Sequence, residues 1–237
     1  MQTVILAAGM GSRIRSIHVK PKGFITLGAK PIIQESICKL KAAGIEDILI
    51  VTGYASEEYA TLASNYSDVS IVYNAEFAHY GSLYSLYCAR YWVRSDFLLL
   101  ESDLIFEASA ITDIIQCPHP NVILLSGETQ ATDEVYVEAH DQKLIRMSKQ
   151  RSQLNEADIY GEFVGINKLS FNDYHRLVYC LEQDSQLLHT GCYDEQGLIA
   201  MTNYTDVFCL KKQNLLWSEI DNEYQLTRAK NLYEGII

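Results

Sequence analysis

Short apolar segments alternate with segments of helical periodicity through the first half of the chain. The apolar segments have the length of buried strands and are Thr3–Ala7, Asp47–Thr52, Val69–Tyr73, Phe97–Glu101 and Val122–Ser126. Between them, the spacing of apolar residues predicts helices over Ile33–Ala43, Glu57–Ser64, Ser82–Trp92 and Ser109–Gln116. Such alternation builds right-handed βαβ units. The pattern therefore predicts an α/β fold with a Rossmann-like, mostly parallel sheet flanked by helices.

The second half of the chain lacks this alternation. The elements predicted there are a hairpin of Glu134–Glu138 and Leu144–Ser148, a loop over residues 150–159, a strand at Glu162–Asn167, a helix at Asn172–Glu182, a short strand at Trp217–Ile220 and a helix through Gln225–Tyr233. Asp221 is expected to cap the last helix. Gly191–Asn203 fits more than one structure. We expect one domain over residues 1–237, with a small β-rich lobe in its second half.

Charge and cysteine usage exclude several classes of protein. The formal net charge of −11 argues against nucleic acid as a partner, because nucleic-acid binding favours a basic face. The six cysteines are scattered with no CxxC pair, which argues against a zinc site. No apolar run approaches the 18 or so residues that cross a membrane, and no leader precedes Val4. We expect a reduced, cytoplasmic compartment.

A glycine-rich turn follows the first strand and brings cations with it. Gly9-Met10-Gly11-Ser12-Arg13 is followed by Pro21-Lys22. Glycines let backbone N–H groups approach phosphate oxygens closely, and nearby cations add charge-assisted donors. A P-loop is excluded because Gly-Lys-Ser/Thr does not occur, and Ile14 occupies the third glycine position of a dinucleotide fingerprint. A phosphate-binding loop of another type and a plain strand-to-helix turn both remain.

The segment Leu6-Ala7-Ala8-Gly9-Met10-Gly11-Ser12-Arg13, followed by Pro21-Lys22, resembles the signature of the nucleotidyltransferase family of sugar-phosphate and choline-phosphate nucleotidyltransferases. Members of that family join a nucleoside triphosphate to a phosphorylated acceptor and release pyrophosphate. The resemblance implies that this segment binds the nucleotide and that Arg13 and Lys22 are catalytic. It also implies a nucleotide-binding half at about residues 1–126 and an acceptor-binding half at about 127–237.

Further segments resemble the CTP-dependent branch of the family. They contain the predicted nucleotide-binding residues Thr52, Asn74, Gly81, Ser82 and Ser85. By this resemblance, the backbone around Ala8 and Gly81 and the hydroxyl groups of Ser82 and Ser85 read a pyrimidine, so that CTP is the expected nucleotide. A hydroxyl group on a helix surface is the structural alternative for Ser85.

Two acidic residues resemble the metal-binding pair of the family. Asp103 follows an apolar strand, where a carboxylate suits Mg²⁺, a cation that prefers oxygen ligands. Asp221, in Glu219-Ile220-Asp221-Asn222, resembles the second metal-binding acid, and an ordinary N-cap is its alternative. Glu101 is expected beside this site rather than in it. The resemblance implies Mg²⁺ as cofactor, with Asp103 and Asp221 as catalytic metal ligands.

The implied reaction is attack of an acceptor oxyanion on the α-phosphorus of CTP. Phosphate esters have a second pKa near 6, so much of the acceptor is already anionic at neutral pH. A general base is then unnecessary, and none of the six histidines stands in a recognisable motif. Positioning and charge neutralisation supply the catalysis, with Lys22 on the transferred phosphoryl group.

The segment from Tyr160 to Lys168 resembles the acceptor side of the phosphocholine and aminoalkylphosphonate cytidylyltransferases. The predicted acceptor-binding residues are Tyr136, Lys149, Tyr160, Glu162, Trp217 and Glu219, and core packing is the alternative for the aromatic ones. The match is closest to the 2-aminoethylphosphonate cytidylyltransferases, some of which continue into a transaminase domain, so that this chain is expected to fit into a longer protein. Phosphocholine or phosphoethanolamine as acceptor, and a non-catalytic nucleotide-binding module, are the alternative functions.

Overall fold

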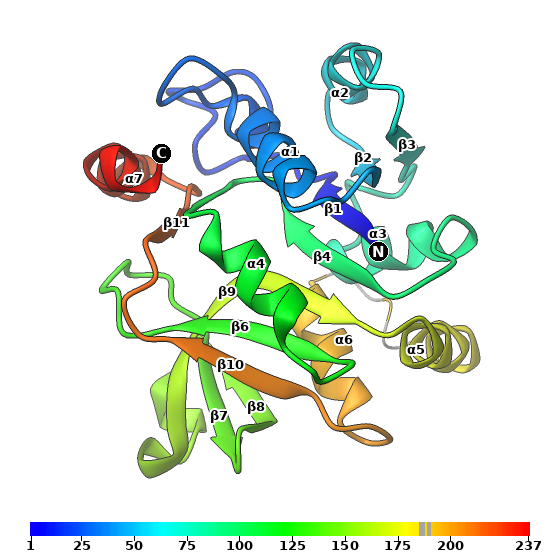
Figure 1. The fold of residues 1–237 in the computed structure, drawn as a ribbon, viewed down its shortest axis with the longest axis vertical. Coiled ribbons are helices and arrows are strands. Elements are labelled where there is room, and N and C mark those ends of the chain that lie inside the picture. The colour runs from blue at the N-terminus through cyan, green and yellow to red at the C-terminus, as the bar shows by residue number, and fades with distance from the viewer. Residues whose placement is uncertain (185–187, 189–190) are drawn as a thin grey trace.

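The computed structural model of the chain describes residues 1–184, 188 and 191–237, and His189 lies outside the described residues. Within these residues, nine strands form one sheet. Its strands are β1 (Gln2–Ala7), β2 (Asp47–Thr52), β3 (Val69–Tyr73), β4 (Phe97–Glu101), β6 (Val122–Ser126), β7 (Tyr136–His140), β8 (Lys143–Ser148), β9 (Ile159–Leu169) and β10 (Phe208–Lys212). They lie in the order β3-β2-β1-β4-β9-β6-β10-β8-β7, and Figure 1 shows the sheet crossing the molecule.

Most strands of this sheet point in one direction. β3, β2, β1 and β4 pair in parallel, and β9 runs antiparallel between β4 and β6. β10 is parallel to β6, and β8 is antiparallel to β10. β4 and β6 are both antiparallel to β9 and therefore point in the same direction as each other. The carboxyl ends of β1, β4 and β6 consequently lie at one edge of the sheet. The predicted α/β fold with a mostly parallel sheet is confirmed.

Helices cover both faces of the sheet. They are α1 (Ile32–Ala42), α2 (Ser56–Ala63), α3 (Ser82–Cys88), α4 (Ser109–Gln116), α5 (Phe171–Gln183), α6 (Asp194–Met201) and α7 (Glu223–Ile236), with short 3-10 turns at Lys22–Phe24, Ala89–Tyr91, Arg151–Gln153 and Glu156–Asp158. Val4 and Leu6 pack with α3, α5 and α6, whereas Ile5 and Ala7 pack with α1, α2 and α4. Strands covered on both faces need apolar residues at nearly every position, as β1 and β6 have.

The strands β1, β2, β3, β4 and β6 and the helices between them match the predicted ranges closely, except that α3 ends at Cys88 and a 3-10 turn completes the predicted segment. Gly191–Asn203, left open by the sequence, contains α6. Two strands were not predicted, β10 and β5 (Leu104–Phe106), and β5 pairs with β11 (Trp217–Glu219) in a separate two-stranded sheet. The three residues of β5 are too few to show an alternating pattern.

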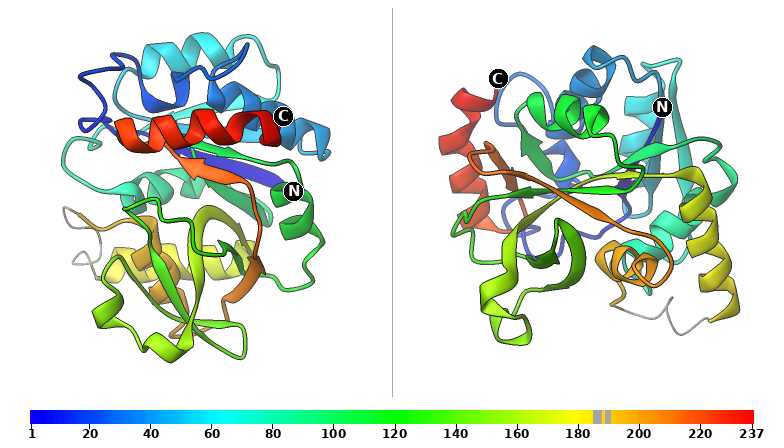
Figure 2. Two further views of the ribbon diagram at one scale, coloured as in Figure 1. Left: turned by 90° about the vertical axis from the view of Figure 1, so that its left-hand side faces the viewer. Right: turned by 60° about the horizontal axis from the view of Figure 1, so that its bottom comes forward.

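The prediction that Asp221 caps the last helix is wrong. The N-cap of α7 is Asn222, whose side chain accepts a hydrogen bond from the Gln225 backbone at 2.9 Å. The Asp221 backbone N–H instead donates to the Gln225 side chain at 2.7 Å, which leaves the Asp221 carboxylate to other partners. The left view of Figure 2 shows α7 beside the segment that follows β1. α7 packs there on Ile14 and Ile25.

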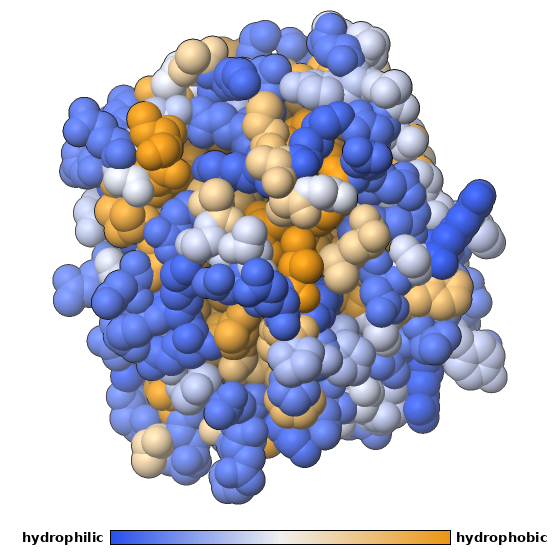
Figure 3. Space-filling view, viewed as in Figure 1, coloured by the Kyte–Doolittle hydropathy of each residue, from blue (hydrophilic) through white to orange (hydrophobic). Residues whose placement is uncertain are grey.

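Polar side chains cover most of the face seen in Figure 3, with a smaller group of hydrophobic side chains near its middle. Among the helices of the described residues, none has the length and apolar character needed to cross a lipid bilayer.

Candidate active site

A cleft of about 820 Å³ opens at the carboxyl ends of β1 and β4 and extends to the loop after β6. Many of the predicted site residues line it, and these are Leu6, Ala8, Gly9, Met10, Ser12, Arg13, Lys22, Gly81, Ser82, Ser85, Asp103, Lys149, Trp217, Glu219 and Asp221. The topology explains the meeting point, because ligands bind at the carboxyl ends of parallel strands. Residues from both halves of the chain therefore form one site.

Gly11 of the glycine loop lies against the aliphatic stem of Lys22. Gly11 has a φ of 59°, in the left-handed region that glycine adopts most easily. A Cβ atom at Gly11 would also lie 3.1 Å from the Lys22 Cγ atom, so a larger residue would push the lysine away. The sequence thus places glycine where both the backbone conformation and the approach of Lys22 require it.

Lys22 lies between two acidic residues. Its ammonium group contacts the carboxylates of Asp103 and Asp221, and Arg13 also contacts Asp221. Burial tends to lower the pKa of Lys22, but the two carboxylates outweigh it and raise that pKa above its ordinary value. Burial tends to raise the pKa of Asp221, yet Lys22 and Arg13 hold it below its usual range. Lys22 and Asp221 are therefore both charged at neutral pH.

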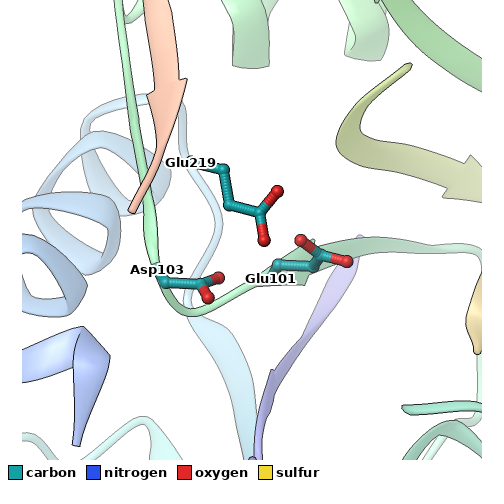
Figure 4. A group of neighbouring side chains, drawn as sticks. All are labelled: Glu101, Asp103 and Glu219. Atoms are coloured by element: carbon teal, nitrogen blue, oxygen red, sulfur yellow. The ribbon is translucent and has the colours of Figure 1, made fainter. Parts of the chain in front are cut away.

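A group of carboxylates surrounds this lysine. β5 and β11 pair so that Glu219 lies opposite Leu104, and the Ile220 backbone donates to the Asp103 carbonyl at 3.0 Å. This register brings Glu219 beside Asp103 and Glu101, whose carboxylate oxygens lie within 4.8 Å of one another (Figure 4). Burial and the charges of neighbouring acids raise the pKa values of Glu101 and Glu219 well above their usual range.

The oxygen donors of this group suit a divalent cation such as Mg²⁺, which binds carboxylates and keeps several waters. The grouping differs from the predicted pair in one respect. Glu101 and Glu219 group with Asp103, whereas the Asp221 carboxylate faces Lys22 and Arg13. Metal binding by Asp103 and Asp221 stays a prediction.

Hydrogen bonds hold the predicted base-binding residues Ser82 and Ser85 in place at the wall of the cleft. Asn74 is fully buried and donates to the Ser85 hydroxyl at 3.0 Å, and Ser85 is only 4% exposed, so it is not a helix-surface hydroxyl. Ser82 donates to the Asp194 carboxylate at 2.5 Å. A Cβ atom at Gly81 would lie 2.1 Å from the Cys192 carbonyl, so only glycine allows these segments to approach.

Other predicted nucleotide-binding residues do not line the cleft. Thr52 is fully buried and its hydroxyl donates to the Val72 carbonyl at 3.4 Å. Ala7, Gly11 and Asn74 are likewise not among the described residues that line the cleft. Gly11 and Asn74 contact residues that do line it, Lys22 and Ser85 respectively.

Three of the predicted acceptor-binding residues lie elsewhere. Tyr136, Tyr160 and Glu162 line a separate cavity of about 210 Å³ next to Lys211. Both carboxylate oxygens of Glu162 accept hydrogen bonds from the Thr129 backbone N–H, at 3.0 and 2.9 Å. The geometry therefore gives Glu162 the task of holding a loop, because its carboxylate is already used there.

Comparison with known proteins identifies the family. Residues 3–158 match the MobA-like NTP transferase domain. The chain belongs to this family. The membership confirms the resemblance that the glycine loop and Pro21-Lys22 indicated, and it covers β1 to the end of the loop before β9.

Relatives of this NTP transferase domain include several named cytidylyltransferases. The choline-phosphate cytidylyltransferase of Streptococcus pneumoniae is 32% identical over 52% of the chain and 53% of its own length. That of Haemophilus influenzae is 25% identical over 94% of the chain and 84% of its own length. The 2-aminoethylphosphonate cytidylyltransferase of Lancefieldella rimae is 34% identical over 36% of the chain and 35% of its own length. The chain thus spans about half of the first relative and about a third of the last.

The fold of the NTP transferase domain is also that of a solved structure. The inositol-1-phosphate CTP transferase from T. maritima superposes with a TM-score of 0.81, at 19% identity, over 99% of this chain and 95% of that one. At this identity the likeness shows the fold alone, and it extends across both halves of the chain.

Several residues of the cleft were absent from the predicted site of the NTP transferase domain. They include Glu101, Glu134, Phe163, Glu195 and Arg228. Phe163 stands inside the segment that resembles the acceptor side, and Glu101 stands two residues before Asp103, so both carried a signal. Glu134 stands in a loop and Glu195 at a helix start, with no motif around either, and only the fold brings them to the site.

Replacing Glu219 by Gln is expected to raise the melting temperature of this NTP transferase domain at about pH 8. Burial and the charges of Asp103 and Asp221 raise the pKa of Glu219. A carboxyl group with a raised pKa in the folded state costs stability above that pKa, and the cost disappears as the pH falls toward the unfolded pKa of about 4.3. Thermal unfolding should show the gain at about pH 8 and lose it near pH 4.

The exposed Glu46 provides the matched control for this prediction, since Glu46→Gln removes the same charge outside the cleft. Its melting temperature should equal that of the wild type at both pH values. A Glu219→Gln protein that is no more stable than wild type at the higher pH contradicts the prediction.

Proposed function

We propose that the chain is a cytidylyltransferase that transfers CMP from CTP to 2-aminoethylphosphonate, giving CMP-2-aminoethylphosphonate and pyrophosphate. The observation that carries this proposal is the position of Lys22, whose ammonium group contacts Asp103 and Asp221 beside the glycine loop. Cationic and acidic groups in contact at the end of a glycine loop suit a polyphosphate with its metal ion. The names of the relatives support a cytidylyl group as the one transferred.

The base side of the cleft suits a pyrimidine. Gly81, Ser82 and Ser85 line it, and Asn74 fixes the Ser85 side chain by a hydrogen bond. Small side chains with hydroxyl groups at the start of α3 leave room for one ring and supply donors and acceptors for its edge. This combination supports cytosine as the base.

The reaction needs positioning more than proton transfer. An oxygen of the acceptor phosphonate attacks the α-phosphorus of CTP, the bond to the β-phosphate oxygen breaks, and pyrophosphate leaves. Lys22 and Arg13 supply charge-assisted hydrogen bonds to the phosphate oxygens, where charge develops during the reaction. Lys149 lines the same cleft and is the residue proposed to bind the phosphonate.

We propose Asp103 and Asp221 as the residues that hold Mg²⁺, with Glu219 and Glu101 next to them. When bound, the ion neutralises charge on the phosphate oxygens. The acids keep a further task, because they fix the ammonium group of Lys22 at the site.

An excess of acids supports a cationic acceptor. Among the described residues of the cleft wall, the acids are Glu101, Asp103, Asp133, Glu134, Glu195, Glu219 and Asp221, and the cations are Arg13, Lys22, Lys149 and Arg228. A buried carboxylate oxygen of Glu195 has no hydrogen-bond partner among the described residues. A primary ammonium group carries three N–H donors and suits such oxygens, whereas a quaternary one has none. This favours 2-aminoethylphosphonate.

Phosphocholine is the second candidate acceptor. Trp217 and Phe163 line the same cleft, and aromatic faces bind quaternary ammonium groups. A non-catalytic nucleotide-binding module is less well supported, since Lys22, Asp103 and Asp221 are all present.

The proposal is tested by measuring pyrophosphate release from CTP with 2-aminoethylphosphonate, phosphocholine and phosphoethanolamine. We expect kcat/KM for 2-aminoethylphosphonate to exceed that for phosphocholine by about tenfold or more, because each unpaired buried polar group costs about 1–3 kcal/mol. A preference for phosphocholine would overturn the choice of acceptor. Tight binding of CTP without turnover on any of the three would overturn the enzymatic function.

A further inference from the structure

Asp133 joins a cation of the glycine loop to a cation of the acceptor side. One of its carboxylate oxygens lies 2.8 Å from the Lys149 ammonium group, and the other lies 2.9 Å from the Arg13 guanidinium group. The side chain of Asp133 is 22% exposed, and both cations are more than half exposed. A single anion thus bridges two cations that stand far apart in the sequence, at the wall of the cleft.

The segment that carries Asp133 is strained between two fixed ends. At one end the Thr129 backbone N–H donates to Glu162, and at the other the Val135 carbonyl accepts from the Phe163 backbone at 2.8 Å. Between these ends, Gln130 has a φ of 57° and Thr132 a φ of 74°. The left-handed region is unfavourable for side chains with a Cβ atom, most of all for a β-branched one such as threonine. The contacts of Asp133 with the two cations help to hold segment 130–134 in this conformation.

We propose that Asp133 is an internal competitor for the anionic group of the acceptor. Its carboxylate takes the place between Lys149 and Arg13 that the phosphonate takes when the acceptor binds, and segment 130–134 moves out in exchange. The identity of the acceptor rests on the proposed function, whereas the anion site itself does not. The site between Lys149 and Arg13 should therefore select a tetrahedral oxyanion. An external carboxylate carries the same charge as the Asp133 carboxylate, so it gains no binding energy by replacing it.

The exchange is physically reasonable for a phosphonate. A phosphonate dianion offers each cation an oxygen, as Asp133 does, but with more charge and a third oxygen for further donors. The ion pairs of Asp133 are partly exposed and therefore weak, so a dianion displaces them. Relief of the backbone strain at Gln130 and Thr132 favours the same direction.

The test is titration of inorganic phosphate into the wild-type protein and into Asp133→Asn by calorimetry. We expect the dissociation constant to fall about tenfold in the variant, since two competing ion pairs are lost. Glu134→Gln is the matched control, because it removes the same charge from the neighbouring position of the same cleft wall. It should change the dissociation constant about twofold at most. Adding Lys149→Met to Asp133→Asn should abolish the gain, which assigns it to this pair of cations.

Asp133→Asn binding no more tightly than Glu134→Gln would overturn the proposal. The same titration of inorganic phosphate into Asp133→Ala should show a similar fall in the dissociation constant. Circular dichroism verifies that each variant is folded. The outcome is separate from that of the proposed function, because phosphate binding requires no turnover. If the wild type turns over 2-aminoethylphosphonate, KM for that acceptor should also fall about tenfold in Asp133→Asn.

Discussion

Lys22→Ala is expected to lower the rate of pyrophosphate release by about 10²–10³-fold, which corresponds to roughly 2.7–4 kcal/mol of transition-state stabilisation. The Lys22 ammonium group is mostly buried and already placed by Asp103 and Asp221, so it needs no reorganisation to meet a phosphate oxygen. The effect should appear in kcat, because the lysine acts on charge that develops during the transfer. Steady-state pyrophosphate release measures it.

Lys20→Ala is the matched control. Lys20 is two residues away, 56% exposed and paired with Glu58 at 3.1 Å on the surface, so its loss should leave kcat near that of the wild type. We expect Lys22→Ala to remain folded but less stable. Breaking a buried ion pair costs about 3–5 kcal/mol, and the loss here should be smaller because Arg13 still contacts Asp221. Pyrophosphate release at the wild-type rate by folded Lys22→Ala would exclude Lys22 from catalysis.

The first half of the fold was predictable because its signals are local. The strands β1 to β4 and their helices show their apolar patterns within single windows, and burial on both faces makes the middle of β1 and most of β4 continuous apolar runs. The glycine loop and Pro21-Lys22 stand within one short segment, so the residue that lies at the centre of the cleft could be found from the sequence.

The acceptor side was less predictable because the fold, rather than any motif, assembles it. Asp133 reaches the cleft from a loop with two left-handed residues, and Glu195 from the first turn of α6. Neither position has a periodic pattern around it. Conversely, Glu162 stands in a segment that resembles the acceptor side, yet its carboxylate binds the Thr129 backbone. A short motif indicates the region of a site, but the direction of one side chain depends on strand register.

Asp103→Asn is the second substitution with a large expected effect. Asparagine keeps the size of the side chain and the backbone hydrogen bond from Ile220 to residue 103, but it removes the charge that contacts Lys22. We expect pyrophosphate release to fall by about 10²–10³-fold, because the substitution removes both the proposed metal ligand and the partner of the proposed catalytic lysine. Asp113→Asn, on α4 and paired with Lys212 at 2.8 Å, removes the same charge far from the cleft and should remain active.

A second measurement separates the metal from the lysine. A ligand that binds only the folded state stabilises it, by about 2.7 kcal/mol at 100 times the dissociation constant. Mg²⁺ should therefore raise the melting temperature of the wild type, of Lys22→Ala and of Asp113→Asn, but not that of Asp103→Asn. If Asp103→Asn gains as much from Mg²⁺ as the wild type, Asp103 acts through Lys22 alone, and Glu101 and Glu219 become the candidates for holding the metal, since their carboxylates lie in the same group.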